Sequence, residues 1–162
     1  MAALTAILLL AATMLVGSCR PKAKAPDDAR QETSVDVDSV SVRAALDSLM
    51  VVDSRAAIDS AYAGSEEYHE AHAAYDRIID RLTEGEGDAG RILTELGYAI
   101  ELMQTNGRYF ATHSSEMAKP VNQQRMMLNG EKVKRLRQQL IQMKLTDEER
   151  GRLDSLNAVI SF

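Results

Sequence analysis

The chain of 162 residues is poor in cysteine, proline and aromatic residues, and these shortages exclude several classes of protein. It has one Cys, which excludes an intramolecular disulfide framework and a metal site built from several cysteines. Its aromatic share is 4%, with no Trp, which leaves little material for a deep ligand pocket. A net charge of −5 differs from the basic balance of a dedicated nucleic-acid-binding domain. The length fits one domain, with or without appendages.

The N-terminal segment has the composition of a signal peptide. Residues 1–18 contain no charged side chain, and the apolar run over residues 6–16 is shorter than the about 20 residues that span a bilayer. The run leads into Val16-Gly17-Ser18-Cys19, in which the only Cys follows two small residues. This segment resembles the lipobox of bacterial lipoproteins. The resemblance implies cleavage before Cys19 and acyl chains, such as palmitate, on a mature chain that begins there. Several acyl chains make release from a membrane negligible.

The charges around the apolar run leave two locations open. No Lys or Arg precedes the run, whereas Arg20, Lys22, Lys24 and Arg30 follow it. An uncleaved signal-anchor with this pattern would place the domain in the cytoplasm. The lipobox favours the bacterial cell envelope instead. Arg20 does not resemble the Asp that usually marks inner-membrane retention, so we expect the periplasmic side of the outer membrane.

Residues 19–38 have the composition of an unfolded tether. They contain two prolines, no large apolar residue and both signs of charge, so ordering them would bury too little apolar surface to offset the lost entropy. About 20 flexible residues reach roughly 25 Å. The sequence therefore predicts a signal peptide over residues 1–18, a lipidated tether over 19–38 and a folded domain over 39–162.

The predicted domain is helical throughout. Its apolar residues recur at alternating spacings of three and four, which is typical of amphipathic helices, and no alternating strand pattern interrupts them. The stripes are Val42, Ala45, Leu49, Val52 and Ala56; Tyr68, Ala71, Tyr75, Ile78 and Leu82; Leu93, Leu96, Ile100, Met103, Gly107 and Phe110; Met126, Asn129, Val133, Leu136, Leu140 and Met143; and Leu153, Leu156 and Ile160. We expect an all-α antiparallel bundle, or coiled-coil-like hairpins, of four to five helices.

Capping residues predict where these helices begin. Ser65 is followed by two glutamates, and Thr146 is followed three residues later by Glu149, which forms a capping-box pattern. Asp88 is the expected cap after a glycine-rich segment, and Pro120 suits a first helical position.

Charge is distributed unevenly along the domain. Residues 38–88 carry twelve acidic and four basic side chains, a balance of −8, whereas residues 125–162 carry eight basic and five acidic ones, a balance of +3. Arg125, Lys132, Arg137 and Lys144 flank the fourth stripe. Two interpretations remain open for this basic strip of residues 125–144. It pairs with the acidic early helices within the bundle, or it binds anionic headgroups or an acidic partner.

The candidate metal ligands are Glu66, His69 and His72. Glu66 and His69 have the Glu-x-x-His spacing of di-iron bundles, but no second copy of this motif is present. The two histidines are three residues apart, a spacing compatible with weak Zn²⁺ or Ni²⁺ binding together with Glu66. The simpler interpretation is a solvated helix face.

Two other short segments invite functional interpretations. His113 precedes Ser114 and Ser115, but no strand-turn-helix elbow surrounds them, so we expect a serine helix cap. The Leu-Thr-Asp-Glu-Glu sequence of residues 145–149, with a looser copy at residues 82–86, resembles segments of Spy/CpxP-type periplasmic chaperones.

Taken together, the residues predict a lipid-anchored envelope protein that acts by binding rather than catalysis. Its expected contacts are the membrane through Cys19 and an envelope protein or a second copy of the chain. No nucleic acid, cofactor or small-molecule substrate is indicated. A client-binding chaperone and a weak metal sensor are the alternatives.

Overall fold

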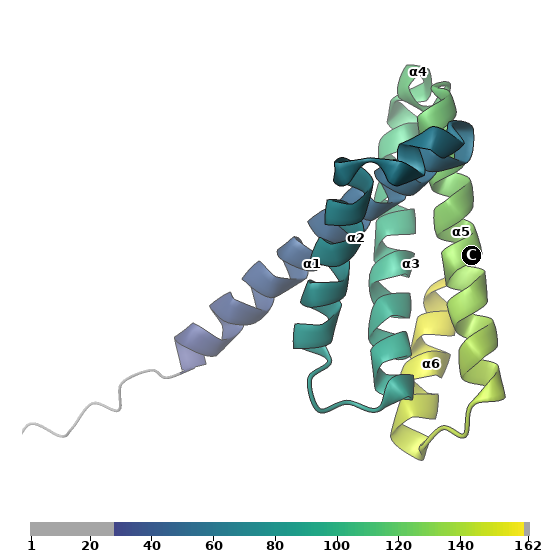
Figure 1. The fold of residues 1–162 in the computed structure, drawn as a ribbon. Helices are drawn as coiled ribbons and strands as arrows, with labels where there is room; N and C mark the ends of the chain where they lie inside the picture. The colour runs from purple at the N-terminus through teal and green to yellow at the C-terminus, as the bar shows by residue number, and fades with distance from the viewer. Residues whose placement is uncertain (1–27, 161–162) are drawn as a thin grey trace, which may run out of the picture.

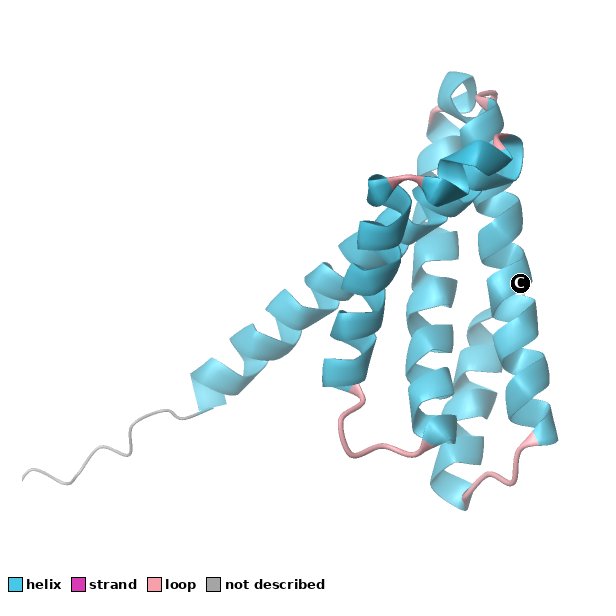
Figure 2. Ribbon diagram, viewed as in Figure 1, coloured by secondary structure: helices cyan, strands magenta, loops and turns pink. Residues whose placement is uncertain are grey.

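The computed structural model describes the backbone of residues 28–160 and the side chains of residues 40–160. This part of the chain contains helices and no strand (Figure 2), so the all-α prediction is confirmed. The elements are α1 (Asp28–Ile58), the 3-10 helix η1 (Ser60–Gly64), α2 (Glu66–Leu82), α3 (Asp88–Thr112), α4 (Ser114–Met117), α5 (Pro120–Gln142) and α6 (Asp147–Ile160). Cys19 and the predicted signal peptide lie outside the described residues.

The first helix begins earlier than the sequence predicted. The folded domain was expected to begin at residue 39, and the helix α1 that contains this position begins at Asp28. The prediction of an unfolded tether rested on the lack of large apolar residues in residues 19–38. Extending an existing helix, however, requires only one further residue to be ordered for each new hydrogen bond.

The helices are arranged around α1 and the α3–α5 pair (Figure 1). α1 packs against α2, to which η1 connects it, and also against α5 and α3. α3 and α5 run antiparallel, joined at one end by the short α4, and α6 turns back to pack on α3. α2 and α5 both contact α1, and α2 meets α5 through the Tyr75 ring, whose centroid lies 4.9 Å from Lys132 Nζ. The predicted antiparallel bundle is thus compatible with the observed packing.

The core contains most of the predicted stripe residues. The following members of the predicted stripes are buried: Val42, Leu49, Val52, Tyr75, Leu93, Leu96, Ile100, Phe110, Asn129, Val133, Leu136, Leu140 and Leu153. The prediction missed Leu46 and Ile79, which are fully buried. At the predicted seam position, the Asn129 side chain donates a hydrogen bond to the carbonyl oxygen of Ala99, 3.2 Å away. This bond links α5 to α3 in the middle of their contact.

The helix caps agree with three of the four predictions. Ser65 accepts a hydrogen bond from the backbone N–H of Tyr68, and Pro120 is the first residue of α5. The capping box is present, because Glu149 Oε2 accepts from the backbone N–H of Thr146 at 2.8 Å. The prediction for Asp88 is wrong. Gly87 holds the N-cap position, and Asp88 lies in the first turn, where its negative charge still favours the helix.

Candidate functional site

The most buried ionisable side chains meet where α1, α2, α3 and α5 converge. Lys132 of α5 and Glu95 of α3 have side chains only 9% and 15% exposed, and Lys132 Nζ donates to Glu95 Oε2 at 3.1 Å. Arg91, one turn before Glu95, places its Nε 3.5 Å from Glu95 Oε1. Because two cationic groups face this carboxylate, the burial of its charge is compensated.

Tyr75 of α2 completes this cluster. Its hydroxyl donates to Glu95 Oε2 at 3.3 Å, and Lys132 Nζ lies 4.9 Å from the centroid of its ring. A cation at that distance over an aromatic face is attracted by the negative charge density of the ring. Glu95 therefore accepts hydrogen bonds from α2 and α5, and this one carboxylate links three helices.

Burial raises the pKa of the Tyr75 phenol far above its ordinary value of 10, and the neighbouring Glu95 carboxylate adds to the shift. In the unfolded chain the phenol ionises near its ordinary pKa. The stabilisation linked to Tyr75 is therefore fully present below about pH 10 and is lost as the pH rises above it, by about 1.4 kcal/mol per pH unit.

We expect Tyr75→Phe to reduce this alkaline loss of stability, leaving the part that comes from Tyr68, whose phenol pKa is also raised. Urea unfolding at about pH 9 and about pH 11 measures the slope, since the Tyr75 phenol ionises in the unfolded chain between these two values while it stays protonated in the folded state. Tyr109→Phe, which alters an exposed ring, is the matched control and should keep the wild-type slope. An equally steep slope in Tyr75→Phe and in wild type would contradict the assignment.

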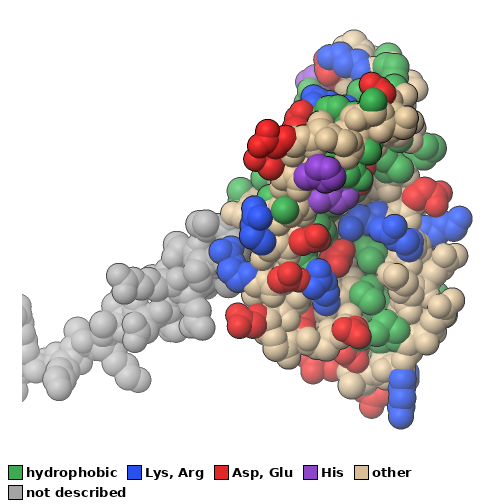
Figure 3. Space-filling view, in the orientation of Figure 1, with side chains coloured by type: hydrophobic (Ala, Val, Ile, Leu, Met, Phe, Trp, Pro, Cys, Tyr) green, Lys and Arg blue, Asp and Glu red, His purple; other side chains and the backbone are tan. Residues whose placement is uncertain are grey.

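A second polar pair borders the first. His72 Nε2 lies 2.9 Å from Asp53 Oδ1 and so connects α2 to α1. The Tyr68 ring packs on His72 with centroids 4.3 Å apart, and burial, followed by the charge of Asp53, raises the pKa of the Tyr68 phenol. Tyr68 and His72 both line an open cavity of about 490 Å³. Figure 3 shows histidine side chains at the middle of this face, with basic side chains to their right.

Of the three predicted metal ligands, only His72 belongs to this cluster. Its ring nitrogen is engaged by Asp53, whereas Glu66 and His69 are exposed on α2. Across the described side chains, no three His, Cys, Asp or Glu residues are grouped closely enough to hold a metal ion.

The bases of the basic strip differ in whether they form ion pairs within the described part of the chain. Arg125 forms an ion pair with Asp47 of α1 and donates to Asn106 Oδ1 at 3.1 Å, and Lys132 pairs with Glu95. These two bases are therefore used within the bundle. Arg137 and Lys144 have no ion pair among the described residues.

The serine cap predicted near His113 is wrong. His113 itself occupies the N-cap position of α4, and neither Ser114 nor Ser115 caps the helix. The His113 ring stacks on Tyr109 with centroids 4.1 Å apart, and its Nδ1 lies 2.9 Å from the Tyr109 carbonyl oxygen. These contacts hold the imidazole against the end of α3.

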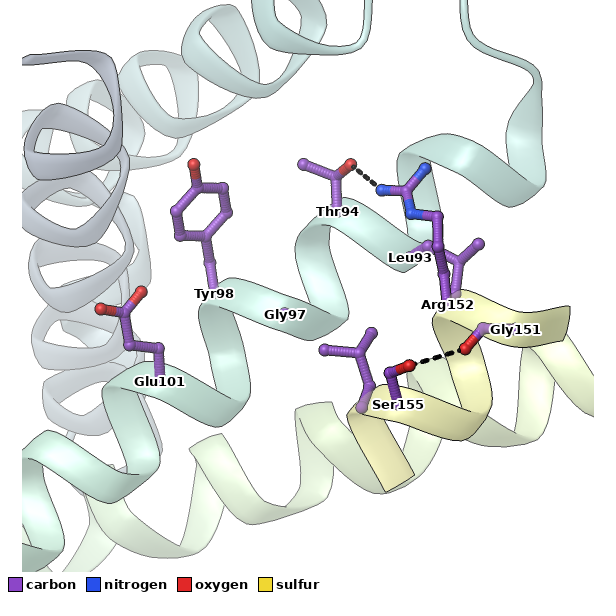
Figure 4. A pocket seen from close by; sticks show the side chains of 9 residues that line it. Leu93, Thr94, Gly97, Tyr98, Glu101, Gly151, Arg152 and Ser155 are labelled. Atoms are coloured by element: carbon purple, nitrogen blue, oxygen red, sulfur yellow. Dashed lines mark hydrogen bonds between the residues drawn. The ribbon is translucent and has the colours of Figure 1, made fainter. Parts of the chain in front are cut away.

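A groove between α3 and α6 was not predicted from the sequence. It encloses about 650 Å³ (Figure 4), with Thr94, Gly97 and Tyr98 on the α3 side and Arg152 and Ser155 on the α6 side. Arg152 Nη2 donates to Thr94 Oγ1 at 3.3 Å across it. The sequence signal was Gly97 within a helical stretch, since a glycine there leaves room between the helices.

The comparisons with known proteins give no match to a protein family, a curated protein or a solved structure. None of the described helices has the length and apolar character needed to cross a membrane. In the polar cluster, the charges of Glu95, Lys132 and Arg91 neutralise one another. Sequence reasoning missed Glu95 and Asp53 and identified Lys132 only as a base that flanks the fourth stripe, because the partners of these residues lie on other helices.

Proposed function

We propose that the chain is a lipid-anchored protein of the bacterial cell envelope whose helical bundle acts by binding, without catalysis. The observation that carries this proposal is the position of Cys19. The only cysteine of the chain follows Val16-Gly17-Ser18 at the end of an uncharged apolar segment. A cysteine elsewhere in the chain would lack this signal-peptide context. Acylation of Cys19 would supply the membrane attachment.

The paired charges of the interior support a binding role. Lys132, Glu95 and Arg91 neutralise one another, and His72 is held by Asp53. Groups paired in this way position helices, and the opposite charges of Lys132 and Glu95 neutralise each other. The working surface in this proposal is therefore the outside of the bundle.

The segment between Cys19 and the bundle sets the reach of the anchored domain. Residues 20–27 precede the first described helical residue, Asp28, and Val42 is the first described residue of α1 that is buried. Eight extended residues span roughly 28 Å, and the fourteen helical residues that follow add about 21 Å. In this proposal the anchored bundle can therefore meet a partner some tens of ångströms from the headgroups.

Membrane fractionation of wild type, Cys19→Ser and the double variant Cys19→Ser/Ser39→Cys tests the proposal. Wild type should fractionate with membranes, and Cys19→Ser should lack the acyl chains because its hydroxyl does not replace the thiol. The double variant restores one thiol outside the motif and should also lack them. Radiolabelled fatty acid incorporated equally into wild type and Cys19→Ser would contradict lipidation at Cys19.

A further inference from the structure

α6 is attached to the bundle through α3 alone. Every other helix of the described chain packs on at least two elements, whereas α3 is the one element that packs on α6 (Figure 1). Leu153 is the buried residue of α6, and Leu156 and Ile160 are partly buried against the same core. Val159, beside Ile160, is 40% exposed. A small apolar contact therefore holds this helix in place.

No ion pair among the described residues joins α6 to another helix. The ion pair between Arg150 and Asp147 lies within α6 itself. Arg152 Nη2 donates to Thr94 Oγ1 of α3 at 3.3 Å, and this hydrogen bond is exposed to solvent. Because an exposed hydrogen bond is readily replaced by bonds to water, it adds little to the attachment of α6.

The packing between α3 and α6 is incomplete. The open groove of about 650 Å³ borders their contact, and a glycine of each helix, Gly97 and Gly151, lines it (Figure 4). A Cβ atom built on Gly97 would lie 3.7 Å from Leu156 Cδ2, which is an ordinary van der Waals distance. Room for a methyl group therefore remains between the two helices, and atoms that border such a space lose part of their dispersion attraction.

α6 is also a self-contained unit of local structure. Thr146 and Glu149 form its capping box, so the hydrogen bonds that cap the start of the helix come from the segment itself. Residues 143–146 connect it to α5 without helical structure. α6 has 14 residues, and helices of this length are marginal in water by themselves. Release from α3 would therefore unfold α6 without breaking the helical hydrogen bonds of α5.

We propose that α6 is a cover that opens as one unit while the other helices stay folded, and that its opening uncovers the side of α3 that carries Leu93, Gly97 and Tyr98. Leu93 is only 1% exposed in the closed arrangement. Segments with few buried contacts open at a lower free energy than the whole fold. In the proposed function the outside of the bundle is the working surface, so α6 determines whether this side of α3 belongs to it. That role rests on the proposed function, whereas the opening itself needs neither lipid nor partner and is measured separately.

Residue-resolved amide hydrogen exchange on the full chain in detergent micelles tests the cover. The amides of residues 151–157 should be at least about 100-fold less protected than those of α3 around Leu96, since the latter exchange only when the whole fold opens. Opening as one unit predicts equal protection across residues 151–157. Protection that falls steadily along these residues would show fraying of a helix end and would overturn the cover.

Two glycine variants of α3 form a matched pair. Gly97→Ala places a methyl group against Leu156, whereas a Cβ atom at Gly107 would meet nothing within 4 Å. Both substitutions favour the helical state of α3 to a similar extent, which stabilises the whole fold but not the closed position of α6. Gly97→Ala should therefore raise the protection of the α6 amides about two- to fourfold, up to the value of one buried methyl group. Gly107→Ala should leave it unchanged.

Ile79→Val, at a fully buried side chain of α2, provides the converse test. It should lower the protection of the α3 amides about two- to tenfold and leave that of α6 unchanged, because α2 does not pack on α6 and stays folded when α6 opens. If α6 protection changes with that of α3 in Ile79→Val or in Gly107→Ala, α6 opens only together with the bundle. Equal α6 protection in Gly97→Ala and Gly107→Ala would show that α6 does not close on Gly97. Either result overturns the proposal.

Discussion

Glu95→Leu should destabilise the bundle by about 3–5 kcal/mol, the range expected when one partner of a buried ion pair is removed. The substitution leaves the Lys132 ammonium, only 9% exposed, with the Tyr75 ring as its remaining contact in the cluster. It also removes the acceptor of the Tyr75 hydroxyl. Urea unfolding at neutral pH gives the free energy of unfolding directly, provided the transition is two-state.

The double variant Glu95→Leu/Lys132→Met distinguishes the cost of leaving the Lys132 ammonium without its carboxylate partner from the cost of lost packing. With both charges replaced by apolar side chains, stability should return to within about 1–2 kcal/mol of wild type. Glu101→Leu is the control, because its ion pair with Arg43 joins two partly exposed side chains and should contribute at most about 1 kcal/mol. Equal losses in Glu95→Leu and Glu101→Leu would contradict the central place of Glu95 in the cluster.

Leu96→Ala should cost about 3–4 kcal/mol of unfolding free energy, from lost apolar burial and the cavity left behind. Leu96 is fully buried on α3, in the core shared with α1, α5 and α6. Ile141→Ala, at a side chain 74% exposed, should stay within about 0.5 kcal/mol of wild type. Chemical denaturation measures both variants. A loss below about 1 kcal/mol in Leu96→Ala would mean that α3 is not central to the core.

The helices and their caps were predictable because both are local features of sequence. Ser65 and the Thr146–Glu149 pair bond to backbone groups within one turn, so the spacing alone identifies them. Leu46 and Ile79 were missed because a buried helix face is wider than one line of residues at spacings of three and four. A stripe marks the centre of the face, and neighbouring positions complete it.

The polar cluster was not predictable, because its contacts join residues far apart in the chain. Lys132 was noted as a base, but its partner Glu95 lies on α3 and not on the acidic early helices. His72 was grouped with Glu66 and His69 by its spacing on one helix. In the fold it lies against α1 and bonds to Asp53. Choosing between such alternatives requires the relative positions of helices, which sequence periodicity does not supply.

Pairing within the bundle describes only some of the bases of α5. Arg125 and Lys132 lie on its inward side and pair with Asp47 and Glu95. Lys134 lies on the outward side without an ion pair among the described residues. Net charge by segment detected the imbalance but averaged over these two sides of one helix.

The intact mass of the protein extracted from membranes tests the central claim most directly. The account predicts a chain that lacks residues 1–18 and exceeds the polypeptide mass from Cys19 onward by the mass of a diacylglyceryl group on its sulfur and of the lipid on its amine. Fragmentation should place that added mass on Cys19. A membrane-bound protein that retains residues 1–18 without modification would contradict the lipid anchor and identify an uncleaved signal-anchor instead.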